Sequence, residues 1–188
     1  MGATSVAPFS AESYIYMNMK YLKHLKVVLL HKWYVGTECF RCGLYWQGIV
    51  HDLSKFSPTE FVESAKYFQG DSSPTIASHE ANGYSKAWLH HKGRNKNHWE
   101  YWTDFYDGEA KPIEIPMRYI AEMACDMVGA GKAYNQEPAW DYGEPLKYFR
   151  EYGDHWLMTD RVRWWLEYYL VSYKNNGKVA WSKTFEMV

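Results

Sequence analysis

Cysteine is scarce in this chain of 188 residues: there are three, an odd number and too few for a disulfide framework. Such usage is typical of a reducing compartment. The N-terminus lacks the basic segment followed by an apolar stretch that a secretory signal peptide needs. No run of about 18 apolar residues occurs, which argues against a membrane-spanning helix. We therefore expect a cytoplasmic protein with no membrane segment.

The chain also lacks an excess of charge of either sign. Its 21 lysines and arginines are balanced by 22 acidic residues, so that the net charge is −1. A general nucleic-acid-binding protein carries a basic face, and this balance argues against that class. Aromatic residues, by contrast, make up 19% of the chain. They predict a core of large rings, some of which are candidates for lining a pocket.

The spacing of apolar residues predicts helices along most of the chain and no convincing pair of strands. Ser10 can cap the first helix, and Ser57 to Glu60 form a capping box at the start of another. Residues 69–83 are rich in Gly, Ser, Pro and Asn and predict a loop, while 178–187 could be extended. The length fits one domain over residues 1–188, so we expect a compact all-α multi-helix domain. The expected helices span 10–41, 44–52, 58–68, 84–91, 97–106, 116–134, 144–152 and 160–174.

Histidines and aspartates in the first two thirds of the chain are candidate metal ligands, because imidazole and carboxylate suit Zn, Fe and Mn. His51 and Asp52 are adjacent at the end of a predicted helix. The rise of a helix places His31 nearly level with His51, whereas His24 lies two turns lower, about 10 Å away. We therefore prefer His31 as the first ligand. The alternative role for His24 is that of a polar residue at the pocket mouth or on the surface.

Asp126 lies in the middle of an apolar predicted helix, where a carboxylate is destabilising unless it is paired or bound to a metal. Glu122 is one turn earlier on the same face. The small residues 129–131 would let another helix or a ligand approach closely. The alternative is a buried Asp126 paired with Arg118 or Lys132.

Three further histidines precede this helix. His90 and His91 are adjacent and point about 100° apart on a helix, so only one should face the site. His98 follows a loop that contains Arg94 and Lys96. A cationic loop beside a metal is what a phosphorylated substrate would need, although an ordinary polar turn is the alternative.

The order His31, His51-Asp52 and Asp126 resembles the HD-domain superfamily of metal-dependent phosphohydrolases. The string from His51 to Lys55 resembles that superfamily's signature of His-Asp, an aliphatic residue, a small residue and Lys. The stretches HDLSKFSPTEF, AWLHHKGRN and EMACDMVGAGKA also resemble an uncharacterised HD-related family of bacteria and phages. The resemblance covers about residues 14–135.

This resemblance implies an HD-like metal-binding core over residues 10–135, followed by a C-terminal helical extension over 136–188. It implies one or two divalent transition metals, drawn from Mn, Fe, Co, Ni and Zn. A first metal would be held by four side chains and a second by further histidines, with Asp52 shared between them. The implied ligands are His31, His51, Asp52 and Asp126 for the first metal, and one or two of His90, His91 and His98 for the second.

The resemblance also implies a function. We expect a phosphohydrolase that acts on a nucleotide or another small phosphorylated compound through a metal-activated water, with a homo-oligomer left open. The alternatives are a di-iron oxygenase and a non-catalytic, metal-stapled module that binds nucleotides. Besides Asp52, the candidate catalytic residues are Lys55 and Arg94, which would contact a phosphate, and Glu122, which would orient a ligand histidine.

Overall fold

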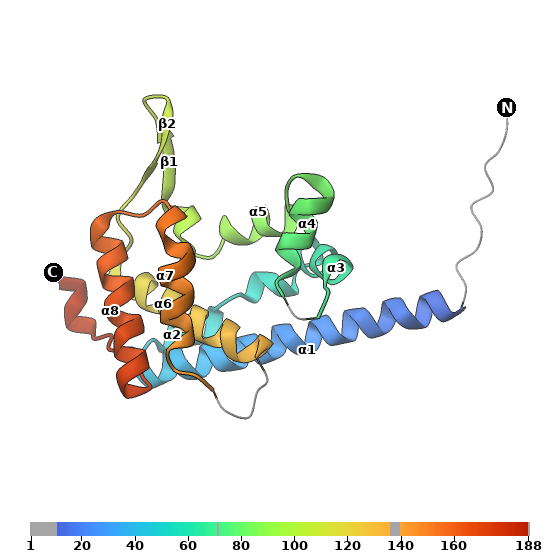
Figure 1. Ribbon diagram of the computed structural model, residues 1–188, viewed down its shortest axis with the longest axis horizontal. Coiled ribbons are helices and arrows are strands. Elements are labelled where there is room, and N and C mark those ends of the chain that lie inside the picture. Colours follow the sequence, from blue (N-terminus) through green and yellow to red (C-terminus); the bar gives the residue numbers. More distant parts are fainter. Residues whose placement is uncertain (1–10, 71, 136–139, 188) are drawn as a thin grey trace.

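The computed structural model describes residues 11–70, 72–135 and 140–187. The longest element is α1 (Ala11–Cys42), whose 32 residues span about 48 Å. It ends before Gly43, whose φ of +89° is the left-handed conformation that stops a helix. The cap expected from Ser10 lies outside the described residues. In Figure 1 the N-terminal end of α1 extends beyond the other described elements.

The described residues form eight α-helices and one small sheet, which confirms the expected compact, mostly α-helical domain. Short 3-10 helices join several of them. Among the described helices, none combines the length and apolarity needed to cross a bilayer. After α1 the elements are α2 (Tyr45–Val50), η1 (Leu53–Phe56), α3 (Pro58–Tyr67), α4 (Pro74–Asn82), α5 (Lys86–Lys92), η2 (Trp99–Trp102), β1 (Thr103–Tyr106), β2 (Glu109–Pro112), α6 (Met117–Tyr134), α7 (Glu144–Tyr152), η3 (Gly153–His155), α8 (Asp160–Asn176) and η4 (Lys183–Met187).

Two expectations about local structure are wrong. The predicted loop over 69–83 contains α4, because Ser73 caps a helix that Pro74 opens and Gly83 ends at φ +77°. Composition pointed to a loop there, but the start and stop signals of a helix were present. Likewise 178–187 ends in the 3-10 helix η4 rather than in an extended segment.

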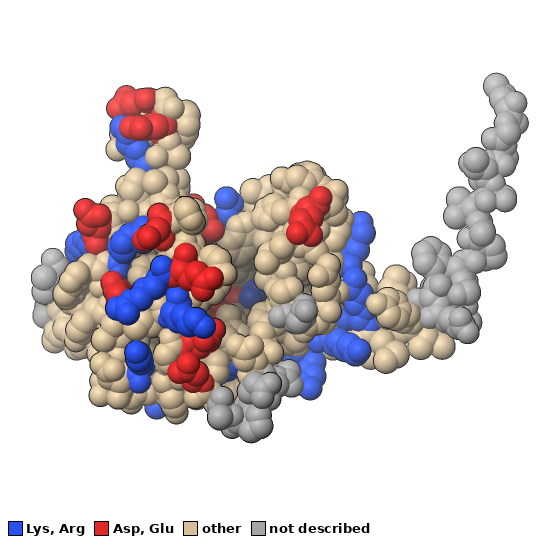
Figure 2. Space-filling view, in the orientation of Figure 1, with Lys and Arg blue, Asp and Glu red and all other residues tan. Residues whose placement is uncertain are grey.

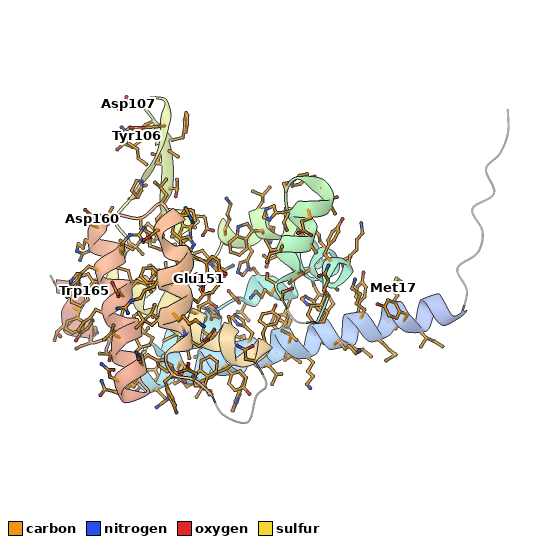
Figure 3. The ribbon with its side chains drawn as sticks, in the orientation of Figure 1. Met17, Tyr106, Asp107, Glu151, Asp160 and Trp165 are labelled. Carbon is orange, nitrogen blue, oxygen red and sulfur yellow. The ribbon has the colours of Figure 1, made fainter. Side chains whose placement is uncertain are left out.

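The predicted helix over 97–106 is also wrong, because most of it forms η2 and the first strand of a β-hairpin. The expectation of no pair of strands is wrong for the same reason. The strands β1 and β2 are antiparallel, and Tyr106 pairs with Glu109 across a two-residue turn. Asp107 and Gly108 form that turn with φ of 54° and 81°. Asp-Gly is a strong signal for such a turn, since both positions need positive φ. Figure 3 shows Tyr106 and Asp107 at the tip of the hairpin, away from the helices.

The core lies where α1, α6 and α8 pack together. Val35 of α1 and Val128 of α6 are fully buried in it, as are Leu166, Tyr169 and Tyr173 of α8. The expectation of an aromatic core is confirmed here by the two tyrosines. The C-terminal helices therefore complete the same core that supports α1 and α6 (Figure 1).

Candidate metal centre

Three parts of the chain converge at a first group of candidate ligands. α1 contributes His31, α6 contributes Asp126, and the turn between α2 and η1 contributes His51 and Asp52. The helix expected over 44–52 ends before this pair, which lies in the turn instead. Asp52 has a φ of 54°, a left-handed conformation that aspartate adopts more readily than most residues. The turn brings both side chains to α1 and α6.

Close packing of α1 against α6 brings His31 to Asp126. Gly129 of α6 lies directly against Val35 of α1: a Cβ on Gly129 would be 2.3 Å from Val35 Cγ2. The expectation that small residues here permit a close approach is therefore confirmed. At this separation of the helices, His31 Nε2 lies 3.2 Å from Asp126 Oδ1.

The four side chains of the first group direct one atom each towards a common point. His31 Nε2 lies 2.9 Å from Asp52 Oδ2 and 3.3 Å from His51 Nε2. His51 Nε2 lies 3.3 Å from Asp52 Oδ2 and 3.5 Å from Asp126 Oδ1. Ligands held about 2.0–2.2 Å from one ion are separated by about 2.9–3.5 Å in tetrahedral or octahedral geometry. The atoms are therefore spaced as the ligands of one divalent transition metal would be.

A second group is built around the other oxygen of Asp52. His91 from α5 and His98, which precedes η2, bring their Nε2 atoms to 2.9 Å from each other. Asp52 Oδ1 lies 3.4 Å from His91 Nε2, is buried, and accepts no hydrogen bond from the described residues. A buried acceptor without a donor is destabilising by about 1–3 kcal/mol, and by more when it is charged. A cation between Asp52, His91 and His98 would satisfy this oxygen.

Two of the candidate ligand histidines contact a carboxylate through Nδ1, the ring nitrogen that does not face the ligand groups. Glu122 Oε1 lies 3.0 Å from Nδ1 of His51, and Glu60 Oε2 lies 2.8 Å from Nδ1 of His91. When each Nδ1–H donates to its carboxylate, the lone pair of Nε2 faces the ligand groups. This is the usual arrangement behind a metal-bound histidine. The position of Glu122 thus agrees with the orienting role expected for it.

Glu60 and Asn97 were missed by the sequence interpretation. Glu60 was interpreted only as part of a capping box, and its backbone N–H does donate to Ser57 Oγ. Its side-chain carboxylate, however, forms hydrogen bonds with the two histidines of α5. Asn97 donates from Nδ2 to Asp126 Oδ2 at 2.9 Å. The position of Glu60 in the sequence, five residues after Lys55, was not by itself a signal, because only the folding of α5 onto α3 brings the histidines to it.

These positions decide between His24 and His31 and exclude one of the two partners considered for Asp126, which were Arg118 and Lys132. His31, rather than His24, reaches the first group, and His24 lies further along the same face of α1. Lys132 does not pair with Asp126, since its Nζ lies 2.7 Å from Glu38 Oε1.

His90 belongs to neither group of candidate ligands. Its Nδ1 lies 2.5 Å from Glu60 Oε1, while His91 faces Asp52. Only one member of the adjacent pair therefore faces the site, as the helical geometry predicted. His90 instead helps to fix Glu60, which in turn holds His91.

Arg94 is not brought to the ligand groups either. It is exposed on the turn after α5 and donates to the carbonyl of His90 at 3.4 Å. Asn95 ties this turn to Ser54, with 2.8 Å between Asn95 Nδ2 and Ser54 Oγ. Arg94 and Lys96 consequently line a separate hollow on the outer side of His51.

The charges of the first group favour a cation. Burial lowers the pKa of His51, but Asp52, Asp126 and Glu122 outweigh it and hold this pKa well above its usual value. Burial raises the pKa of Asp52, but the charges of His51 and Lys55 outweigh it and hold this pKa well below its usual value. Burial likewise raises the pKa of Asp126, but the hydrogen bond and the charge of His51 outweigh burial and hold this pKa below its usual value. Both aspartates are therefore ionised near neutral pH.

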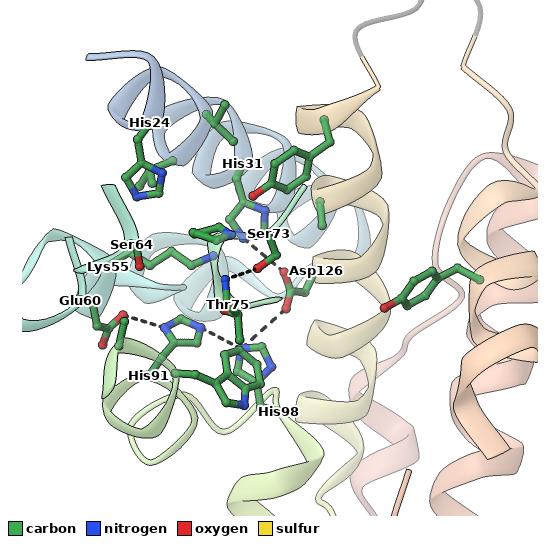
Figure 4. A pocket seen from close by; sticks show the side chains of 18 residues that line it. His24, His31, Lys55, Glu60, Ser64, Ser73, Thr75, His91, His98 and Asp126 are labelled. Carbon is green, nitrogen blue, oxygen red and sulfur yellow. Dashed lines mark hydrogen bonds and ion pairs between the residues drawn. The ribbon is translucent and has the colours of Figure 1, made fainter. Parts of the chain in front are cut away.

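A cavity of about 300 Å³ opens beside both groups. His31, His91, His98 and Asp126 line it, and Lys55 reaches in with Nζ 2.6 Å from Asp52 Oδ2 (Figure 4). Its walls come from α1, η1, α3, α4, α5, α6 and α7, and Figure 2 shows the surface hollowed between the α7 side and the α4–α5 side. The four candidate ligands that line the cavity can thus be reached by a small molecule, whereas His51 and Asp52 are buried behind them.

Replacing Glu122 with glutamine should weaken metal binding about 10–100-fold, because the neutral amide no longer increases the basicity of His51. The measurement is a competition titration with a chelator of known affinity. Glu114→Gln is the matched control, since Glu114 is exposed and pairs with Arg161 on the surface. An unchanged affinity in Glu122→Gln would contradict the orienting role.

Comparison with known proteins identifies a family. Residues 20–172 match a family model described as "Family of unknown function (DUF5662)". The matched range contains all the candidate ligands from His31 to Asp126. Neither a curated protein nor a solved structure matches the chain.

Proposed function

We propose that the chain, which belongs to the DUF5662 family, is a metal-dependent phosphohydrolase acting on a nucleotide or another small phosphorylated compound. The position of Asp52 carries the proposal, because Oδ2 joins the first group of ligands and Oδ1 faces the second. A carboxylate shared in this way would suit a pair of ions, which many phosphoester-cleaving enzymes use. The resemblance to the HD-domain superfamily points to the same chemistry.

The donor set fits divalent transition metals. Nitrogen and carboxylate oxygen ligands suit Mn, Fe, Co, Ni and Zn, and the buried Oδ1 of Asp52 has no other partner among the described residues. When bound, such ions lower the pKa of a shared water and neutralise charge on the attacking and leaving oxygens of a phosphate ester. His31, His51 and Asp126 would hold the first ion with Asp52, and His91 and His98 the second.

The surrounding residues supply what the ions do not. Lys55 brings an ammonium group into the cavity beside the ligands, where it can contact a phosphate oxygen. Glu122 and Glu60 keep His51 and His91 oriented, so that the ligands are in place before substrate binds. Val28 and Trp88 contribute apolar wall, which limits the water around the reacting ester.

The test is phosphate release by protein stripped of metal and reloaded separately with Mn, Fe, Co, Ni or Zn. The substrates are nucleoside monophosphates, sugar phosphates and phenyl phosphate. We expect release of inorganic phosphate with at least one metal and none from the stripped protein. Iron-loaded protein is also assayed for oxygen uptake, since the same ligands suit iron. Oxygen uptake without phosphate release would replace this proposal by the oxygenase, and bound metal without either activity by the non-catalytic module.

A further inference from the structure

His24 lies at the end of the cavity away from Asp126 and His98. It is one of the residues that line the cavity, and it lies seven positions before His31 on the same face of α1, a rise of about 10 Å. Figure 4 shows His24 on α1, farther from Asp126 than His31 is and near Lys55. A molecule whose phosphate lies beside Lys55 could thus extend along α1 towards His24.

The ring of His24 is fixed in position yet lacks a polar partner on one nitrogen. The side chain is 5% exposed, and its centroid lies 5.4 Å from the ring of Phe61 and 5.1 Å from that of Phe68. Nδ1 is buried and has no hydrogen-bond partner among the described residues. A buried polar atom in this state is unfavourable, and the aromatic packing gives no compensation for it. A phenylalanine would pack against Phe61 and Phe68 without leaving a polar atom unpaired. Packing therefore does not explain why this position carries a histidine.

The charge state of His24 restricts what it can recognise. Burial, together with the charge of Lys55, lowers its pKa to about 4. The imidazole is therefore neutral near neutral pH and offers one donor and one acceptor. It is suited to a hydroxyl or an amide-like edge and gives no charge to a phosphate.

The rest of the cavity lining also offers little positive charge to a phosphate. Lys55 is the only lysine or arginine among the described lining residues, and it already contacts Asp52. Ser64, Ser73 and Thr75 add hydroxyls to the wall, and Trp88 and Tyr134 add rings. One phosphate can be matched by this lining, but a second at the far end would meet no cation.

We propose that His24 binds the uncharged, hydroxyl-bearing leaving group of a phosphomonoester and so selects esters of a nucleoside or sugar that carry a single phosphate. This inference rests on the proposed phosphohydrolase function. His24 is a specificity-determining residue at the end of the cavity remote from the ligands. Bisphosphates are poor substrates because their second phosphate would be buried beside a neutral ring.

The test compares His24→Phe with the wild-type protein, both loaded with the same metal. Phenylalanine keeps the ring beside Phe61 and Phe68 but removes both nitrogens. The kcat/KM of a nucleoside 5′-monophosphate is divided by that of phenyl phosphate, whose leaving group has no hydroxyl. We expect this ratio to fall roughly tenfold to hundredfold in His24→Phe, mainly through KM. We also expect the wild type to prefer a pentose 5-phosphate to a pentose bisphosphate.

Thermal stability separates this role from a structural one. Because an unsatisfied nitrogen is replaced by apolar carbon, Tm of His24→Phe should rise by roughly 2–4 °C. A histidine kept for stability would give a fall instead. His79→Phe is the matched control, since His79 is exposed on α4 and should leave both the substrate ratio and Tm unchanged.

The outcomes distinguish this inference from the function on which it rests. Turnover of phenyl phosphate with an unchanged ratio in His24→Phe would overturn the role of His24 alone. A lowered Tm, or a bisphosphate preferred by the wild type, would do the same. No phosphate release from any ester by the metal-loaded wild type would overturn the phosphohydrolase and the role of His24 with it.

Discussion

Asp52→Asn should remove the bound metal from both groups and abolish activity. The variant keeps the size of the side chain, but an amide offers one oxygen, no charge and an NH₂ group that cannot act as a ligand. In Asp52 the oxygen Oδ2 lies beside His31 and His51, and Oδ1 lies beside His91. Asparagine therefore cannot offer an oxygen ligand to both groups at once. Elemental analysis of purified, untagged protein is the measurement. We expect metal in the wild type and essentially none in Asp52→Asn.

Asp107→Asn is a close control for this variant. Asp107 and Asp52 are the only residues other than glycine with positive φ in the described chain, and both have a φ of 54°. Asparagine adopts this conformation as readily as aspartate, so neither turn should be strained by the replacement. Asp107 is at the exposed hairpin tip (Figure 3), and its variant should keep full metal content. Equal metal content in Asp52→Asn and the wild type would overturn the metal centre.

The helices that could be predicted are those whose signals are local. α1, α3 and α6 were predicted nearly to the residue, because apolar spacing, the Ser57 cap and Pro116 mark them in the sequence. α4 and the hairpin were missed although Ser73-Pro74 and Asp107-Gly108 carry equally local signals. In both cases the polar or aromatic composition of the segment was given more weight than its start and turn residues.

In the candidate site, the ligands of the first group could be predicted from the sequence, but a residue that supports a ligand could not. His31, His51 and Asp52 were singled out because imidazole and carboxylate suit metals and because the helix rise places His31 level with His51. Asp126 was singled out because a carboxylate within an apolar helix is destabilising without a partner. The structure brings all four together. Glu60 could not be found in this way. A glutamate at the third position of a helix is the ordinary sign of a cap, and its contact with the histidines exists only after α5 folds onto α3.

The packing of α1 on α6 fixes the distance between ligands that are far apart in the sequence. A Cβ on Gly129 would be 2.8 Å from the backbone nitrogen of Val35 as well as 2.3 Å from its Cγ2. Rotation of the Val35 side chain can relieve the second contact but not the first. Any side chain at position 129 must therefore push the helices apart, and His31 with them from Asp126.

Gly129→Ala should accordingly destabilise the fold by about 2–3 kcal/mol, even though alanine favours a helix by about 1 kcal/mol over glycine. This corresponds to a fall in Tm of roughly 4–12 °C for a chain of this size. Because His31 Nε2 and Asp126 Oδ1 are 3.2 Å apart at the present helix separation, the variant should also bind metal more weakly. The rise in Tm on adding Mn should then be smaller than in the wild type.

For Gly36→Ala, on the facing helix α1, we expect the opposite effect on stability. A Cβ at Gly36 would meet only the carbonyl of Gly48 at 3.4 Å, an ordinary contact, so that the helix propensity of alanine is free to act. Tm of Gly36→Ala should stay level or rise by up to roughly 4 °C. Thermal unfolding of the two variants with and without Mn measures both effects. Equal behaviour of Gly129→Ala and Gly36→Ala would show that helix propensity, and not the close approach of α1 to α6, governs position 129.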